Sequence, residues 1–112
     1  MRAVIQRVSK SSVKVNGEIL GQTELGILVL LGIEDLDNDE DARWLARKIT
    51  GLRVFSDSDE KMNLNIGQVG GDLLVISQFT LHASTKKGTR PSFIKAARPE
   101  KAIPLYERFV KE

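Results

Sequence analysis

Polar and apolar residues alternate with short periods at the start of the chain. Residues 3–8 and 12–15 have the alternation of half-buried strands, and Asn16-Gly17 separates the second run from a further short run at 18–20. An Asn-Gly pair in this position is a strong signal for a two-residue β-hairpin. The continuous apolar run at 25–33 then predicts a strand that is buried on both faces.

The pattern changes to a helical period in the middle of the chain. Apolar residues recur on one helical face between about residues 39 and 50, and a cluster of acidic residues at 34–41 precedes them. Asp37 and Glu40 have the spacing of a capping box, and carboxylates near a helix N-terminus interact favourably with its dipole. Helix capping therefore explains the acidic cluster without a metal ion.

The second half of the chain repeats the order of strands and then a helix. The expected elements are strands at 52–55, 62–66 and 72–81 and a helix at 101–112. Pro104 would either kink this helix or delay its start. The whole order predicts one mixed α/β domain over residues 1–112, with mixed or antiparallel sheets and two helices.

Composition narrows the class of protein. With 112 residues, 41% hydrophobic and 29% charged, the chain fits one compact domain, and a partner subunit would add useful burial. The absence of cysteine excludes disulfides and thiolate chemistry and fits a reducing compartment. No apolar run is long enough to span a bilayer, and no signal peptide precedes the first strand, so we expect a cytoplasmic location.

Charge is segregated along the chain, although the net charge is only +2. Residues 73–99 contain no acid and five basic residues, namely Lys86, Lys87, Arg90, Lys95 and Arg98. Such a segment suits a polyphosphate partner, but an ordinary solvated loop explains it equally well.

The end of the 72–81 strand carries polar side chains. If the strand continues, Gln78 and Thr80 share one face, with His82 beyond them, while Ser77 and Phe79 share the other. Polar groups at the end of a buried strand need partners. They are either hydrogen-bonded strand-end residues or the floor of a cleft, and periodicity does not separate the two.

Five sequence blocks, taken together and in order, closely resemble the D-aminoacyl-tRNA deacylase family. They are Gln6-Arg7-Val8, Phe55-Ser56-Asp57, Lys61-Met62-Asn63-Leu64-Asn65, Ser77-Gln78-Phe79-Thr80-Leu81 and Gly88-Thr89-Arg90-Pro91-Ser92-Phe93. The resemblance implies a homodimeric hydrolase that needs no metal and no cofactor. It would cleave the ester of D-aminoacyl-tRNA, and of mischarged glycyl-tRNA, as a proofreading step of translation.

The same resemblance implies roles for individual residues. Ser77, Gln78 and Thr80 would be catalytic, and the substrate-binding residues would be Arg7, Phe79, Lys86, Lys87 and Arg90. Thr80 is a candidate nucleophile without an obvious general base beside it. The alternative is that the ribose 2'-hydroxyl of the substrate assists, while main-chain amides stabilise the oxyanion. The family does not need a histidine at position 82.

One family feature is absent from this sequence. The family carries an Asn-x-Gly-Pro-x-Thr loop near its C-terminus that excludes L-amino acids, and no Gly-Pro occurs here. We therefore expect a domain that lacks the family's C-terminal strands, in which Arg7 has lost the loop that it anchors. Two alternatives to an enzyme stay open: a non-enzymatic RNA-binding module and a small structural dimer.

Overall fold

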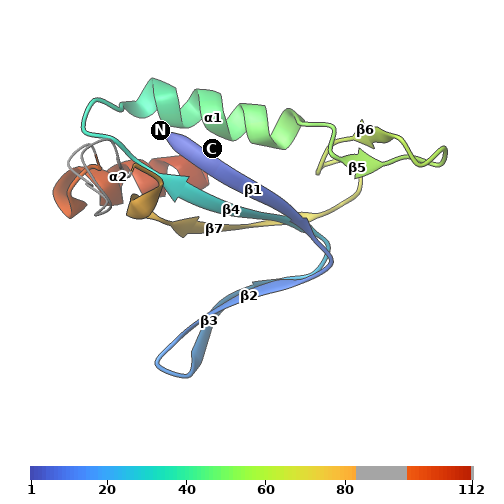
Figure 1. Cartoon of the computed structure of the whole chain (residues 1–112), viewed down its shortest axis with the longest axis horizontal. Coiled ribbons are helices and arrows are strands. Elements are labelled where there is room, and N and C mark those ends of the chain that lie inside the picture. Colours follow the sequence, from blue (N-terminus) through green and yellow to red (C-terminus); the bar gives the residue numbers. More distant parts are fainter. Residues whose placement is uncertain (83–95, 112) are drawn as a thin grey trace, which may run out of the picture. The chain divides into compact units, whose positions relative to one another are not determined.

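Two α-helices, one short 3₁₀-helix and seven strands follow one another in a computed structural model that describes residues 1–82 and 96–111, apart from the side chains of Phe79 and Thr80 (Figure 1). The elements are β1 (Arg2–Val8), β2 (Ser11–Val15), β3 (Glu18–Thr23), β4 (Gly26–Gly32), α1 (Asp39–Gly51), β5 (Phe55–Ser56), β6 (Met62–Leu64), β7 (Asp72–Ser77), η1 (Phe79–His82) and α2 (Pro99–Lys111).

The strands form one three-stranded sheet and two antiparallel pairs. The larger sheet has the order β1-β4-β7, and the pairs are β2-β3 and β5-β6. The amide of Asp72 donates to the carbonyl of Leu25 before β4, and the amide of Gln78 donates to Leu31 at its end, so β4 and β7 run parallel. The prediction of an α/β fold with mixed and antiparallel sheets and two helices is confirmed.

The β2-β3 hairpin has the turn that its sequence predicts. Asn16 and Gly17 have φ angles of 52° and 83°, and Val15 pairs with Glu18 across the two-residue turn. Both central residues are thus in the left-handed region, which asparagine and glycine tolerate better than other residues. The local sequence is sufficient to specify this turn.

Strand β4 is fully buried on one face only. Ile27, Val29 and Leu31 have 0% relative exposure, whereas Leu28 and Leu30 between them are only half-buried. The prediction of a strand buried on both faces is therefore wrong for this chain. Burial alternates along the strand, but the sequence does not show this, because leucines also occupy the more open face.

The chain divides into two compact units, each with its own buried residues. The first unit comprises Met1–Val4, Leu30–Arg47 and Ser77–Glu112, and the second comprises Ile5–Val29 and Lys48–Ile76. The core of the first unit contains Leu31, Ile33, Ala42, Ala46, Ala97, Leu105 and Phe109. The core of the second contains Ile27, Val29, Ile49, Phe55 and Ile66.

A reciprocal capping box begins α1, one residue later than predicted. The amide of Asn38 donates to Asp41 Oδ2 at 2.9 Å, and the amide of Asp41 donates to Asn38 Oδ1 at 3.1 Å. Both main-chain amides, which have no partner within the helix, thus have a hydrogen-bond acceptor. The expected pair of Asp37 and Glu40 is wrong, because the carboxylate of Asp37 is engaged elsewhere.

Strand β7 ends four residues before the predicted end. It stops at Ser77, and the chain turns into η1, in which the amide of Leu81 donates to the carbonyl of Gln78 at 3.4 Å. Strand alternation therefore does not apply beyond Ser77, and the expected shared face of Gln78, Thr80 and His82 is wrong. A tertiary hydrogen bond of 2.7 Å from the Gln78 amide to Leu31 accompanies this change of direction.

Helix α2 begins at Pro99 and continues to Lys111 with Pro104 inside it. Pro99 suits a first helical residue, because its missing N–H would have no partner there. Pro104 is exposed and removes one backbone hydrogen bond, to the carbonyl of Glu100, without ending the helix. None of the helices in the described ranges is long and apolar enough to cross a bilayer.

Candidate active site

The block Ser77 to Thr80 lies where β7 passes into η1. Ser77 is the last residue of β7 and is exposed, and Gln78 is half-buried at the junction. Phe79 and Thr80 are the first two residues of η1. The described structure thus brings the predicted catalytic residues together at one strand terminus, by sequence adjacency and by the turn that follows.

The main-chain amides of this turn differ in their availability. The Gln78 amide is bonded to the carbonyl of Leu31, and the first donor within η1 is the Leu81 amide. The amides of Phe79 and Thr80 precede that donor, so no hydrogen bond within η1 engages them. If main-chain groups stabilise an oxyanion here, these two amides are the candidates, and the Gln78 amide is not.

Arg7 is an exposed residue of β1. Its Nη1 atom donates to the main-chain carbonyl of Val54 at 2.7 Å. Arg7 belongs to the second compact unit, whereas the Ser77 to Thr80 block belongs to the first. Its role in substrate binding stays a prediction.

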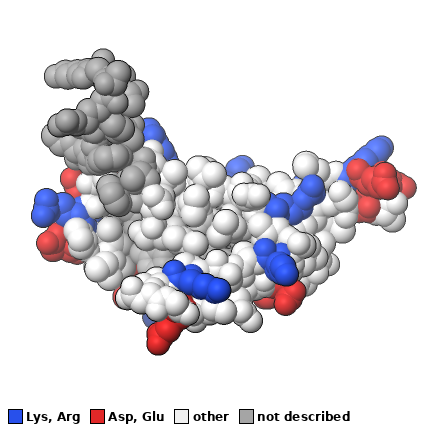
Figure 2. All heavy atoms as spheres, turned by 60° about the horizontal axis from the view of Figure 1, so that its bottom comes forward, with Lys and Arg blue, Asp and Glu red and all other residues white. Residues whose placement is uncertain are grey.

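The predicted basic contacts Lys86, Lys87 and Arg90 lie outside the described residues. On the face drawn in Figure 2, the described Lys and Arg side chains stand apart from one another, and several adjoin acidic side chains. The described residues on that face therefore form no concentrated basic patch. The acid-free sequence of residues 73–99 remains the feature that favours electrostatic RNA binding.

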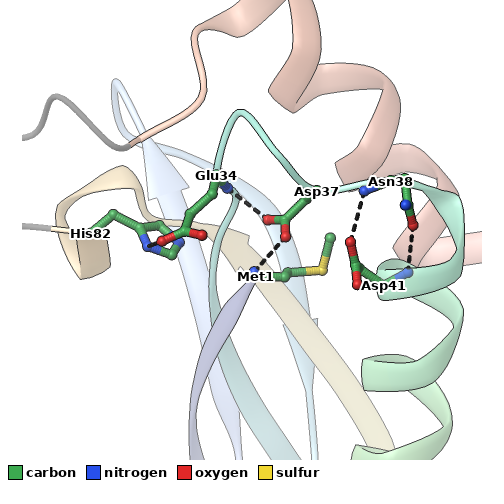
Figure 3. A network of polar contacts seen from close by, with 6 residues as sticks. All are labelled: Met1, Glu34, Asp37, Asn38, Asp41 and His82. Atoms are coloured by element: carbon green, nitrogen blue, oxygen red, sulfur yellow. Dashed lines mark hydrogen bonds and ion pairs between the residues drawn. The ribbon is translucent and has the colours of Figure 1, made fainter.

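A buried polar network beside η1 was missed by sequence reasoning (Figure 3). The amino group of Met1 lies 2.7 Å from Asp37 Oδ1, and Asp37 Oδ2 accepts a hydrogen bond of 2.7 Å from the amide of Glu34. The Met1 and Asp37 side chains are 2% and 8% exposed. The acidic run was explained by capping alone, and no local signal indicates that Asp37 contacts the N-terminal amino group instead.

His82, at the end of η1, is the other buried polar side chain of this region, with 3% exposure. Its Nδ1 atom lies 3.1 Å from Glu34 Oε1, and Figure 3 shows the imidazole and the carboxylate facing each other. The contact is within ion-pair distance, although its angles do not meet those of a hydrogen bond. Sequence reasoning gave His82 no role.

The turn between β5 and β6 is organised by Asp57. Its Oδ1 atom accepts hydrogen bonds from the amides of Lys61 at 3.1 Å and Asp59 at 2.8 Å. The Lys61 amide is the main reason that the pKa of Asp57 lies below the ordinary value for aspartate. This part of the Phe55-Ser56-Asp57 block thus has a structural explanation.

The described residues also show which places in the chain could hold a ligand. Within residues 1–82 and 96–111, no three His, Asp or Glu side chains are grouped so that they could hold a metal ion. A groove of about 460 Å³ lies beside the strand ends of the β2-β3 hairpin and is lined by Lys10, Ser11, Ser12, Gln22, Thr23 and Glu24. It includes none of the predicted site residues.

Comparison with known sequences gives consistent results. A family model described as D-Tyr-tRNA(Tyr) deacylase matches residues 4–112. A protein of Akkermansia muciniphila named D-aminoacyl-tRNA deacylase is 62% identical over 112 residues, which are 100% of this chain and 75% of the relative. A protein of the same name from Flavobacterium johnsoniae is 57% identical over 111 residues, covering 99% of this chain and 74% of its own.

Solved structures agree in fold. A structure described as c-Myc DNA Unwinding Element Binding Protein has a TM-score of 0.93 and 38% identity, covering 99% of this chain and 74% of its own. Another, described as a probable eukaryotic D-amino acid tRNA deacylase, has a TM-score of 0.80 and 19% identity. The match covers 97% of this chain and 64% of the other. At that identity the second likeness bears on the fold alone.

Proposed function

This chain belongs to the D-Tyr-tRNA(Tyr) deacylase family, and on that premise we propose that it hydrolyses the ester bond between a D-amino acid and tRNA. The products are the free amino acid and an uncharged tRNA, so the reaction is a chiral proofreading step of translation. The observation that carries the proposal is the set of relatives named D-aminoacyl-tRNA deacylase that are 57% and 62% identical across nearly the whole chain.

We assign the chemistry to Ser77, Gln78 and Thr80. The support is their position at one strand terminus, where Ser77 is exposed and η1 begins immediately afterwards. The amides of Phe79 and Thr80 would stabilise the developing oxyanion, because the Gln78 amide already bonds to Leu31. The side chain of Gln78 would lie near the ester carbonyl.

The hydroxyl that assists the reaction is, in this proposal, the 2'-hydroxyl of the terminal ribose. A threonine hydroxyl needs an adjacent general base to become a good nucleophile, and neither Ser77 nor Gln78 can act as one. The ribose 2'-hydroxyl is already held next to the ester carbonyl, where it would orient a water molecule by hydrogen bonding. The water would attack the carbonyl carbon, its oxygen would end in the carboxyl group of the free amino acid, and the 3'-oxygen would leave with a proton as the 3'-hydroxyl of the tRNA. Thr80 would then support the site without forming a covalent intermediate.

The substrate contacts follow from the chemistry of the 3' end of tRNA. Phe79 would shape the pocket for the terminal adenosine, since unpaired bases stack on aromatic rings. Lys86, Lys87 and Arg90 would meet phosphates, and the absence of acids around them in the sequence favours this. Arg7 is also proposed to belong to the substrate-binding residues.

Several finer features complete the proposal. The chain acts as one deacylase domain in a cytoplasmic homodimer, needs no metal or cofactor, and also accepts mischarged glycyl-tRNA. A second subunit fits a chain of this size, which gains burial from a partner. The absence of cysteine fits a reducing compartment.

The test compares the release of amino acid from three substrates, D-tyrosyl-tRNA, glycyl-tRNA and L-tyrosyl-tRNA. We expect release from the first two above the spontaneous rate. The rate with the third measures how far a chain without the Gly-Pro loop still excludes L-amino acids. Gln78→Ala should slow the release, whereas Gln22→Ala, the same substitution at an exposed position on β3, should not. Equal rates with and without the protein on all three substrates would refute the proposed function.

A further inference from the structure

The burial of His82 calls for an explanation. Its side chain is 1% exposed, and neither ring nitrogen has a hydrogen-bond partner in the described part of the chain. A buried polar group without hydrogen bonds costs free energy. The nearby charged groups are Glu34, whose Oε1 is 3.1 Å from Nδ1 and whose side chain is 31% exposed, and Asp37 and Arg2 on the neighbouring segments.

The imidazole packs directly on the end of β4. A Cβ atom built on Gly32 would lie 3.0 Å from His82 Cδ2 and 3.1 Å from Nε2, and also 3.0 Å from Leu81 Cβ. The ring thus lies against a strand position that has no side chain, which allows this close approach. The absence of a side chain at Gly32 makes room for the last turn of η1.

Turn η1 is held at both of its ends. Before it, the Gln78 amide donates to Leu31 at 2.7 Å. At its end, Leu81 accepts a hydrogen bond of 2.9 Å from Arg2 Nη1, and His82 faces Glu34. Phe79 and Thr80 lie between these attachments. Glu34 is itself fixed, because its amide is bonded to the buried Asp37 carboxylate.

We propose that His82, through its contact with Glu34, is a positioning residue that holds η1 against the end of β4 and so orients the main chain of Phe79 and Thr80 for catalysis. The inference rests on the proposed deacylase function for its catalytic part only. Enzymatic groups must be held close to their productive geometry, and displacements on the order of 1 Å can lower a rate about 100-fold.

Three substitutions separate the polar contact from simple packing. His82→Phe keeps a ring on Gly32 but removes both nitrogens, and Glu34→Gln removes the charge of the partner. His82→Asn places an amide close to the position of Nδ1 and should restore the contact. Glu107→Gln, the same change as Glu34→Gln at an exposed position on α2, is the matched control.

Two measurements are made on each variant of the full chain: deacylation kinetics with D-tyrosyl-tRNA, and amide hydrogen exchange across residues 77–82. We expect His82→Phe and Glu34→Gln to lower kcat about tenfold, with KM changed less than about twofold. Exchange at 77–82 should accelerate in both, while exchange in α1 stays at the parent level. His82→Asn should recover most of kcat, and Glu107→Gln should match the parent.

The outcomes distinguish the two proposals. Parent-like kcat and exchange in His82→Phe would overturn the positioning role, and so would an equal acceleration of exchange in α1 and η1, since that would mean a general loss of stability. If the parent shows no deacylation but His82→Phe loosens residues 77–82 selectively, the proposed function fails while the role of His82 in holding η1 stands.

Discussion

The close parallel pairing of β4 with β7 leaves no room for a side chain at Gly26, so substitution of Gly26 should destabilise the protein. A Cβ atom added there would overlap the carbonyl oxygen of Asp72 and would lie 2.8 Å from the Asp72 carbonyl carbon and 2.9 Å from its amide nitrogen. All three atoms are main chain, so no side-chain rotation relieves the overlap. Gly26→Ala must therefore separate the beginnings of the two strands.

The size of the effect follows from these distances. Non-bonded heavy atoms sit at about 3.5 Å, so the 2.8 Å contact alone requires a separation of roughly 0.7 Å, and the closer overlap with the carbonyl oxygen requires more. Overpacking of this kind costs about 1–3 kcal/mol. The adjacent 3.0 Å hydrogen bond from the Asp72 amide to Leu25 would be lost as well, at about 1 kcal/mol.

We therefore expect Gly26→Ala to lower the free energy of unfolding by about 2–4 kcal/mol. Native domains have only about 5–15 kcal/mol in total, and at about 4 °C per kcal/mol the Tm should fall by about 8–16 °C. The assay is thermal and urea unfolding followed by circular dichroism. Gly51→Ala is the control, because a Cβ at that exposed helix end would meet nothing within 4 Å.

The two variants should differ clearly. Gly51→Ala should unfold like the parent or slightly later, since alanine favours helix more than glycine does. A Gly26→Ala protein whose stability lies within about 0.5 kcal/mol of the parent, the usual range for a harmless surface change, would show that β4 and β7 do not approach as closely as described.

Three other predictions concern the proposed site and the β5-β6 turn. Thr80→Val should retain part of the single-turnover rate, whereas a substrate ending in 2'-deoxyadenosine should react very slowly with the parent protein. If Thr80→Val were inactive and the parent hydrolysed the 2'-deoxy substrate rapidly, Thr80 would be the nucleophile. Replacing Lys86, Lys87 and Arg90 together by alanine should weaken tRNA binding and flatten its dependence on salt, and an unchanged salt slope would reduce them to solvated surface residues. The lowered pKa of Asp57 means that its contribution to stability is present at neutral pH and is lost as the pH falls below about 4. The Tm of Asp57→Asn should therefore fall less than the Tm of the parent when the pH is lowered below about 4. If the Tm of both proteins fell equally with pH, the role assigned to Asp57 would be contradicted.

The elements that sequence reasoning predicted well are those that local chemistry determines. Asn16-Gly17 specifies its own turn, since both residues adopt positive φ and the strands on either side are adjacent in sequence. The helix of α1 follows from its apolar period. Its start at Asp39 was predicted correctly, but the capping pair was misplaced by one residue, because Asp37 contacts the Met1 amino group and Asn38 and Asp41 form the capping box.

The change of direction after Ser77 was not predicted, because apolar periodicity does not show where a strand ends. The residues of 72–81 read as one strand, yet the Gln78 amide bonds to Leu31 and the chain then turns into η1. The burial of His82 against Gly32 follows from the same turn. No periodic pattern within a ten-residue window contains that information.

The candidate site was predicted only in part. Periodicity left Ser77 to Thr80 with two interpretations, and it was the resemblance of five blocks that selected the catalytic one. The structure shows that the Gln78 amide is already hydrogen-bonded to Leu31 and so is not a candidate oxyanion donor. It also shows that Glu34 and His82 contact each other beside η1.

The most direct test of the central claim is multiple-turnover hydrolysis of D-tyrosyl-tRNA with the protein at a small fraction of the substrate concentration. The account predicts that many equivalents of free D-tyrosine appear per protein molecule, at a rate proportional to protein concentration. Stable binding of the charged tRNA with no D-tyrosine released beyond the spontaneous rate would contradict it and would leave an RNA-binding protein instead of an enzyme.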